Sequence, residues 1–198
     1  MQLYWAPRTR SLKVIWMLEE TGLSYESIRV SLDSGMLQEA TFRAINPMMK
    51  VPAIIDGPVK VAECGAILAY LAEQAPDAKL APSVDHPLRG DYLRWLFFSA
   101  GCIEAAYAQK FTGMQLPPRS AGWGDFDRVI GVLDEALSEG PWLLGERFSA
   151  ADVAVASDLR FGVEVFRIVE PLANFRAYID RCTARPAFKR ALEVEQAG

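Results

Sequence analysis

The sequence has little of several residue types that would point to a particular chemistry. It contains one histidine, His86, and three widely separated cysteines, Cys64, Cys102 and Cys182. A single histidine excludes most zinc sites and any triad that needs a second histidine. The odd number of scattered cysteines argues against a disulfide framework and fits a reducing compartment. We therefore expect a cytoplasmic protein without a metal ion.

Charge and hydropathy exclude further classes of protein. The 198 residues carry 21 basic and 25 acidic side chains, a net charge of −4, so the chain lacks the basic footprint of a nucleic-acid-binding protein. No apolar run approaches the roughly 18 residues that a membrane span needs. Residues 1–10 lack the order of charged and apolar segments of a signal peptide. We expect a globular protein with neither a nucleic-acid partner nor a membrane partner.

The hydrophobic pattern divides the chain into two domains. Residues 1–76 fit an order of strand, helix and strand, then a helix, then two strands and a helix. The proline-rich residues 77–87 predict a linker, and residues 88–198 show only helical periodicity. Strands are expected at 2–5, 26–30, 53–55 and 59–61, and a helical or irregular stretch at about 35–45. Helices are expected at 11–22, 64–75, 88–113, 125–139, 150–168, 171–183 and 186–195.

Val51-Pro52 stands at the front of one of these strands. Proline cannot donate to a sheet ladder, so it belongs at the first position of a strand or on a sheet edge. A cis bond is the second possibility, since it costs only about 0.5–1 kcal/mol before proline. It would leave the N–H and C=O of Val51 free to pair with an extended, peptide-like ligand.

Glu63 and Cys64 begin the helix that follows. A helix N-terminus presents unpaired N–H groups and about half a positive charge, so it readily binds a carboxylate. Glu63 could stabilise this helix dipole, or it could receive a ligand's ammonium group while the Cys64 N–H binds the neighbouring carboxylate. Lys50 could bind a second carboxylate. These groups suit an extended peptide with an amino acid head group at one end and an acid at the other.

This stretch resembles the glutathione-binding half of the cytosolic glutathione transferases. The resemblance implies a thioredoxin-like α/β first domain, an all-α second domain, and a cis Val51-Pro52 bond. It implies that the Val51 backbone binds the cysteine of glutathione and that Glu63 and Cys64 bind the γ-glutamyl end. The family has serine where Cys64 stands, and because a thiol is a weak donor, we expect glutathione to bind with lower affinity. The matching segments are Asn46-Pro47, Lys50-Val51-Pro52, Asp56-Gly57, Glu63-Cys64, the run 66–71, the capping-box pattern Ser149-Ala150-Ala151-Asp152, and 184–193.

The loop before the first helix carries the candidates for activating the thiol. The nucleophile must be a thiolate, and the resemblance to serine-dependent members places Thr9 at the serine's position, with Ser11 as the other candidate. Ser11 is also positioned to cap the helix. Positive charge and a helix N-terminus both lower the pKa of a neighbouring thiol. The basic residues of this loop are Arg8, Arg10 and Lys13.

The first long helical pattern of the second domain supplies candidates for the other substrate. The resemblance implies that this region lines the pocket for the electrophile, with Tyr107, Phe111 and Met114 as candidates. Glu104 lies among small apolar residues, where a buried acid needs a partner. The resemblance implies that an acid of this helix reaches the partner subunit's glutathione. Four aromatic residues at helical spacing are expected in the core: Trp16, Trp95, Phe97 and Phe98.

The resemblance implies a homodimeric detoxification enzyme with glutathione as co-substrate. Thr9 or Ser11 would stabilise the thiolate, which would add to a small, hydrophobic electrophile. One alternative is a non-catalytic, transferase-like protein with a binding or regulatory role. Another is glutathione-dependent isomerisation, dehalogenation or peroxide reduction on the same scaffold.

Overall fold

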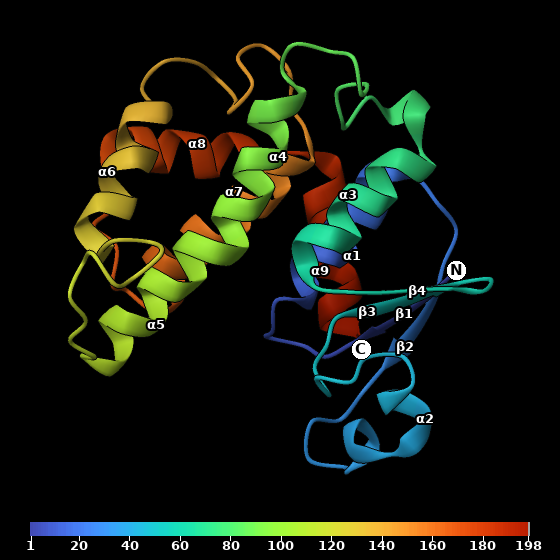
Figure 1. The fold of residues 1–198 in the computed structure, drawn as a ribbon. Coiled ribbons are helices and arrows are strands. Elements are labelled where there is room, and N and C mark those ends of the chain that lie inside the picture. Colours follow the sequence, from blue (N-terminus) through green and yellow to red (C-terminus); the bar gives the residue numbers. More distant parts are fainter. Residues whose placement is uncertain (198) are drawn as a thin grey trace. The chain divides into compact units, whose positions relative to one another are not determined.

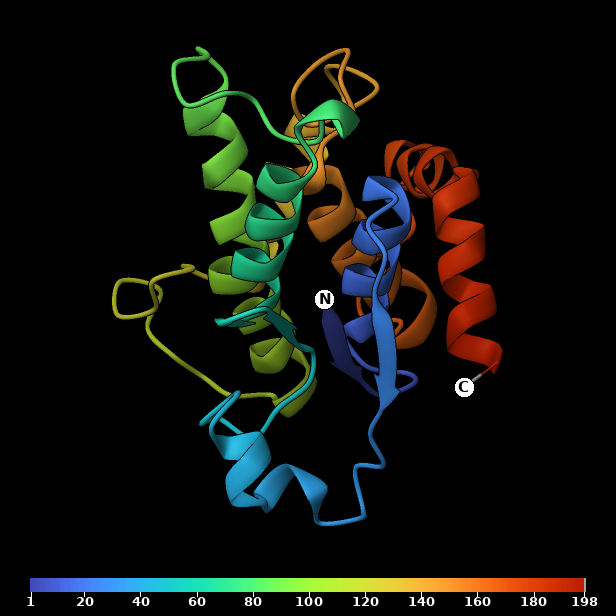
Figure 2. The same ribbon diagram turned by 90° about the vertical axis from the view of Figure 1, so that its right-hand side faces the viewer.

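The structure is a computed structural model that describes residues 1–197, and it forms two compact units. The first unit joins residues 1–79 to the segment from residue 186 onward, and the second comprises residues 80–185. We had expected the last helix to belong to the helical domain. Instead α9 (Pro186–Ala197) packs against α1 (Ser11–Thr21) within the first unit, as Figure 2 shows. Helical periodicity predicts that a segment is a helix but does not say which unit it covers.

A four-stranded sheet forms the centre of the first unit (Figure 1). Its strands are β1 (Gln2–Trp5), β2 (Glu26–Arg29), β3 (Ala53–Asp56) and β4 (Val59–Ala62), in the order β2-β1-β3-β4. β1 pairs in parallel with β2 and antiparallel with β3, and β3 pairs antiparallel with β4. The two strands predicted at 53–55 and 59–61 pair as a hairpin, with Gly57 in its turn at a positive φ of 56° that suits glycine.

Helices cover both faces of this sheet. Leu3 and Trp5 of β1 are buried, and α1 packs with α3 (Cys64–Gln74) on one face. Tyr4, between them in the strand, packs edge-on against Phe42 of the short α2 (Ala40–Arg43) at a ring-centroid distance of 5.6 Å. Figure 1 shows α2 beyond one side of the sheet and α1, α3 and α9 on the other. The central strands β1 and β3 are therefore covered on both faces, whereas the edge strands β2 and β4 are largely exposed. The ends of the central strands are the places where a ligand can approach them.

The second unit is helical, as predicted. Its longer elements are α4 (Arg89–Phe98), α5 (Glu104–Thr112), α6 (Phe126–Ala136), α7 (Ala150–Arg160) and α8 (Ala173–Thr183), and single π turns, η3 (Ser99–Ile103) and η4 (Phe161–Val165), follow α4 and α7.

Two of the four expected core aromatics, Trp16 and Trp95, are buried, and Phe98 is half-buried. The prediction is wrong for Phe97, whose side chain is 74% exposed. Phe97 follows Trp95 by two positions, which is about 200° around a helix, so the two rings point to opposite faces.

The predicted capping box at the start of α7 is confirmed. Ser149 is the N-cap, and its N–H donates to Asp152 Oδ2 at 2.9 Å. Asp152 Oδ1 accepts from the Leu143 N–H at 2.9 Å and from the Tyr178 hydroxyl at 3.0 Å. The pKa of Asp152 is raised, because the effect of burial outweighs the opposing effect of these hydrogen bonds. The fully buried carboxylate thus joins three parts of the unit.

Among residues 1–197, no helix is long and apolar enough to cross a membrane.

Candidate functional site

One end of the sheet gathers the predicted glutathione-binding residues of the first unit. The register pairs Tyr4 of β1 with Ala53 of β3, and Ala53 with Ala62 of β4. Pro52 therefore lies beside the end of β1, and Glu63 lies beside Pro52. Three segments that are distant in sequence meet here: the loop after β1, the Val51-Pro52 bond and the start of α3.

The segment before β3 is fixed by a buried amide. The Val51-Pro52 bond is cis, as the resemblance implies. Asn46, only 3% exposed, donates from Nδ2 to the Lys50 carbonyl at 2.8 Å and accepts from the Met48 N–H at 3.0 Å. We recognised Asn46 as part of the motif but assigned it no role. Its side chain sets the path of the loop and leaves Lys50 exposed.

Glu63 is held in an uncommon backbone conformation at the start of α3. Its φ is 69° and its ψ is 121°, a region that residues with a side chain rarely adopt. Such conformations cost about 1–3 kcal/mol each and cluster at functional sites. Its side chain is exposed and does not cap α3, although its carbonyl accepts the Ile67 N–H at 2.9 Å. The half-buried Cys64 follows as the first residue of the helix.

A small hydroxyl network occupies the loop before α1. Thr9 Oγ1 lies 2.7 Å from the Ala6 carbonyl and 2.8 Å from Ser11 Oγ, and it accepts the Ser11 N–H at 3.1 Å. The expected cap at Ser11 is wrong, because Arg10 is the N-cap and Ser11 is the first helical residue, whose N–H is accepted by Thr9. Ser11 is fully buried and Thr9 is half-buried. Of the two candidate hydroxyls, only Thr9 is open to a ligand.

The charges of this loop are unevenly exposed. Arg8 and Arg10 are exposed, whereas Lys13 is only 3% exposed and belongs to the interior of the unit. Arg8 has a positive φ of 57°, and its N–H donates to Glu195 Oε1 at 2.9 Å. Sequence analysis missed Glu195, because a bond between positions 187 residues apart leaves no local pattern.

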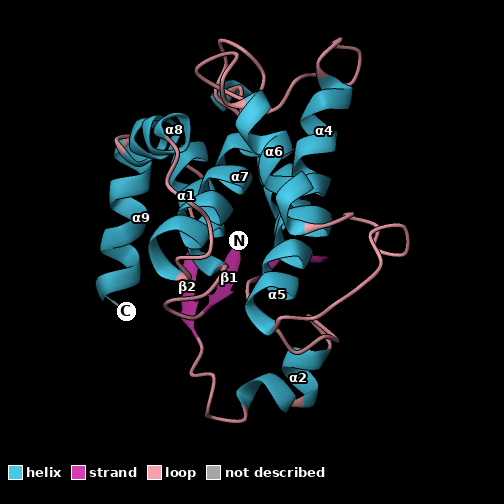
Figure 3. Ribbon diagram, turned by 90° about the vertical axis from the view of Figure 1, so that its left-hand side faces the viewer, coloured by secondary structure: helices cyan, strands magenta, loops and turns pink. Residues whose placement is uncertain are grey.

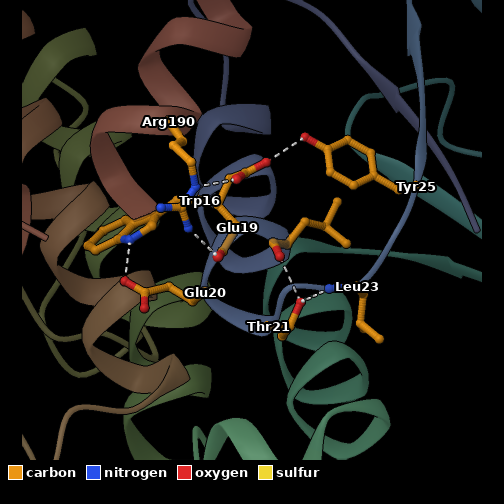
Figure 4. A network of polar contacts seen from close by, with 8 residues as sticks. Trp16, Glu19, Glu20, Thr21, Leu23, Tyr25 and Arg190 are labelled. Atoms are coloured by element: carbon orange, nitrogen blue, oxygen red, sulfur yellow. Dashed lines mark hydrogen bonds and ion pairs between the residues drawn. The ribbon is translucent and has the colours of Figure 1, made fainter. Parts of the chain in front are cut away.

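Polar contacts attach α9 to the rest of the first unit (Figure 4). Arg190 donates from Nε to Glu19 Oε2 and from Nη2 to the Glu19 carbonyl, both at 2.9 Å. The Tyr25 hydroxyl donates to Glu19 Oε1 at 3.2 Å. Burial and the Glu19 charge raise the pKa of Tyr25 to about 12. The rings of Trp16 and Phe188 meet edge-on at 5.0 Å, so apolar and charged contacts together position α9.

The candidates in the second unit lie in different environments. Glu104 is half-buried at the first position of α5. Tyr107 is only 4% exposed, and its hydroxyl has no hydrogen-bond partner among residues 1–197. Phe111 is 70% exposed and packs against Phe166 at a centroid distance of 5.7 Å, and Met114 is 43% exposed. Their roles toward a second substrate and a partner subunit stay predictions.

Within the described part of the chain, no group of three or more His, Cys, Asp or Glu side chains could hold a metal ion.

Comparison with known families identifies the family and the fold. The N-terminal domain of glutathione S-transferase matches residues 1–73, and the C-terminal domain of glutathione S-transferase matches residues 104–181. The chain belongs to the glutathione S-transferase family. The three segments that meet at the end of the sheet all lie within the match to the N-terminal domain of this transferase family.

Individual relatives of this glutathione S-transferase family member align over its whole length. It is 33% identical to the disulfide-bond oxidoreductase YfcG of Escherichia coli (strain K12), covering 100% of this chain and 97% of the relative. The ternary complex of BphK, a bacterial GST, superimposes with a TM-score of 0.84 at 27% identity, over 99% and 100% of the two chains. A glutathione transferase from Burkholderia graminis with two glutathione molecules bound per subunit gives a TM-score of 0.83 at 31% identity, over 100% of this chain and 89% of that one.

Proposed function

We propose that the protein conjugates the glutathione thiolate to a small, hydrophobic electrophile, as a detoxifying glutathione transferase of the cytoplasm. The observation that carries the proposal is one end of the sheet, where the cis Val51-Pro52 bond, the uncapped Glu63 and the loop of Thr9 meet. This end offers backbone, charge and hydroxyl groups to one extended ligand.

Glutathione would be bound by groups along this edge. The N–H and C=O of Val51 would pair with its cysteine residue as a short antiparallel strand does. The Glu63 carboxylate would receive the ammonium of the γ-glutamyl end, and the Cys64 N–H its carboxylate. Exposed Lys50 would bind the acid at the other end. The bound glutathione of the Burkholderia graminis relative supports this ligand.

Thr9 is the residue that we propose stabilises the thiolate. Its hydroxyl has one proton, which the network can give either to the Ala6 carbonyl or to Ser11 Oγ. When a sulfur is held beside Val51, we propose that Thr9 donates this proton to it instead. Ser11 would then position Thr9 without touching the ligand, because its side chain is fully buried. The exposed Arg8 and Arg10 favour the charged sulfur.

A second function, glutathione-dependent reduction of disulfides, is favoured by the 33% identity to the oxidoreductase YfcG. Two glutathione thiols would be oxidised to one glutathione disulfide while the substrate disulfide is reduced to two thiols. Residues 6–13 contain no cysteine, so the nucleophile would be glutathione and not a protein thiol. The second glutathione of the Burkholderia graminis relative fits the stoichiometry of this reaction.

We propose that the protein is a homodimer in which Glu104 reaches the partner subunit's glutathione. Phe97 is 74% exposed, which suits an apolar contact between subunits. Light scattering should give twice 21.9 kDa, and Phe97→Glu should favour the monomer. A wild-type monomer at micromolar concentration would exclude both the dimer and the role of Glu104.

Two assays with the purified protein test the activity. Turnover of 1-chloro-2,4-dinitrobenzene, with retention on immobilised glutathione, is expected for a transferase. Turnover of 2-hydroxyethyl disulfide without turnover of 1-chloro-2,4-dinitrobenzene would identify a disulfide reductase. Retention on immobilised glutathione without turnover of either compound would indicate a non-catalytic protein with a binding or regulatory role. Failure to be retained and to turn over either compound would contradict the proposed function. Separate assays of isomerase, dehalogenase and peroxidase activity cover the remaining alternatives.

A further inference from the structure

A cavity of about 490 Å³ opens beside the thiol-activating loop, on the side of β1 that faces β2. Its volume lies within the range of about 300–1,000 Å³ that small-molecule sites occupy. All of its lining residues belong to the first unit. They are Ala6, Pro7, Arg8 and the five residues 29–33.

The topology of the sheet explains the place of this cavity. β1 and β2 are neighbours in the sheet (Figure 3) and run parallel, with Trp5 opposite Arg29. The Val30 N–H donates to the Trp5 carbonyl at 2.7 Å. Ligands of open α/β sheets bind outside the carboxyl ends of parallel strands. The strand order β2-β1-β3-β4 puts the cavity on one flank of β1 and Val51-Pro52 on the other. The cavity is therefore distinct from the proposed glutathione site at Val51-Pro52, but the loop that carries Thr9 borders both.

The lining of the cavity has an excess of positive charge. It contains two arginines, Arg8 and Arg29, and one acid, Asp33. Glu195 lies nearby but is bound to the backbone N–H of Arg8. Within residues 1–197, neither guanidinium forms an ion pair with a carboxylate. Arginine binds carboxylates through two parallel hydrogen bonds, so two arginines at one cavity favour an acidic ligand.

Glu195 holds the backbone of Arg8 in place. The positive φ of Arg8 is uncommon for a residue with a side chain, and its N–H is fixed by the Glu195 carboxylate at 2.9 Å. The helix that carries Glu195 is itself attached through Arg190 and Glu19. The backbone from which the Arg8 side chain extends is thus positioned in advance, which reduces the backbone entropy lost when a ligand binds.

We propose that this cavity binds the carboxylate of the second substrate, so that the enzyme prefers aromatic electrophiles that carry an acid group. The inference rests on the proposed function, because Arg8 directly precedes Thr9, the residue proposed to hold the thiolate. Arg8 and Arg29 bind the carboxylate, and the accessible apolar side chains of the lining, Pro7 and Leu32, contact the ring.

A matched pair of substrates tests the proposal. 4-Chloro-3,5-dinitrobenzoate carries the acid, and its methyl ester does not. Arg29→Gln, which lies outside the thiol loop, should lower kcat/KM for the acid about tenfold, since the carboxylate loses a charged hydrogen-bond partner. It should change the ester less than about twofold. Arg43→Gln, an exposed arginine of α2 outside the cavity, is the control and should change neither substrate.

A binding measurement separates this proposal from the proposed function. The unreactive 3,5-dinitrobenzoate is titrated by calorimetry against wild type, Arg29→Gln and Arg43→Gln. Binding that weakens about tenfold in Arg29→Gln alone supports the cavity, even where neither substrate is turned over and the transferase activity fails. The proposal is overturned by no binding to wild type, by equal binding to all three proteins, or by equal losses on acid and ester.

Discussion

The helices α3 and α7 begin in opposite ways. At α7 the N-cap Ser149 lies in extended backbone, and buried Asp152 accepts its N–H. At α3 the N-cap Glu63 has a φ of 69°, is exposed, and makes no side-chain cap. At the start of α7 the protein's own side chains satisfy the backbone N–H groups. At the start of α3 the side chain of Glu63 does not do so, and this helix start lies at the end of the sheet where we propose that glutathione binds.

The difference shows how the same local physics serves stability in one place and binding in another. Every helix start has N–H groups without an intrahelical partner and a positive end of the dipole. A buried carboxylate three residues on satisfies this need within α7. At α3 we propose that a ligand's carboxylate accepts from such N–H groups. The uncommon backbone conformation of Glu63 at this site lowers the stability of the fold. Removing each acid should therefore damage a different property.

The largest effect should come from Asp152→Ala. The change leaves the N–H groups of Ser149 and Leu143 and the Tyr178 hydroxyl without their acceptor. We expect the free energy of unfolding to fall by about 3–4 kcal/mol, measured by urea denaturation. Asp127→Ala, an exposed acid in the first turn of α6, is the control and should change stability by less than about 0.5 kcal/mol. If Asp152→Ala lowers the free energy of unfolding by less than about 1 kcal/mol, the hydrogen bonds of Asp152 at the start of α7 do not stabilise the fold appreciably.

Glu63→Ala should weaken glutathione binding by about 1–3 kcal/mol, because the ligand's ammonium loses its charged partner. Glu63→Gly should lose the same affinity but be more stable than Glu63→Ala by about 1 kcal/mol, since glycine adopts a positive φ without a steric penalty. Titration calorimetry and urea unfolding give the two quantities. Unchanged affinity in both variants would remove Glu63 from the site.

Thr9→Ala and Ser11→Ala separate a ligand contact from a supporting one. A hydrogen bond to the thiolate lowers its pKa, so Thr9→Ala should raise the pKa of bound glutathione by about one unit. The activity lost at neutral pH should then recover as the pH rises and the thiol ionises unaided. Ser11→Ala should leave the titration in place but lower stability by about 0.5–1.5 kcal/mol. The thiolate's ultraviolet absorbance against pH measures this, and a shift in Ser11→Ala alone would reverse the two roles.

Cys64→Ser should have the smallest effect. A hydroxyl is a stronger donor than a thiol, so glutathione affinity should stay equal or rise by up to about 1 kcal/mol, while the Cys64 N–H proposed to bind the carboxylate is unchanged. Calorimetry against wild type measures the difference. A clear loss of affinity would show that the thiol itself takes part at the start of α3.

Local patterns explain what could be predicted from the sequence. The capping box, the strands at 53–55 and 59–61 and the first helix at 11–22 each depend on residues a few positions apart, and all three are confirmed. The membership of α9 in the first unit and the bond from Arg8 to Glu195 depend on positions more than 170 residues apart. Sequence periodicity carries no signal for such pairs.

Side-chain direction was the other source of error. Thr9 and Ser11 looked equivalent as hydroxyls near a helix start, but only the packing shows that Ser11 is fully buried. The same limit explains Phe97, which is apolar and yet exposed. Buried Asn46 belonged to the recognised motif, but its hydrogen bonds to the loop it shapes could be assigned only from the structure.

The return of α9 to the first unit has a consequence for synthesis on the ribosome. Residues 1–79 emerge early, but the helix that packs on α1 through Trp16 and Glu19 emerges only after residue 185. The second unit is the continuous stretch 80–185, so all of its residues have been synthesised before the last helix of the first unit. We expect the usual N-terminal-first order of domain folding to be reversed here, with the second unit completed before the first. A chain truncated after residue 185 and released from the ribosome should therefore protect residues 80–185 from protease while α1 stays cleavable.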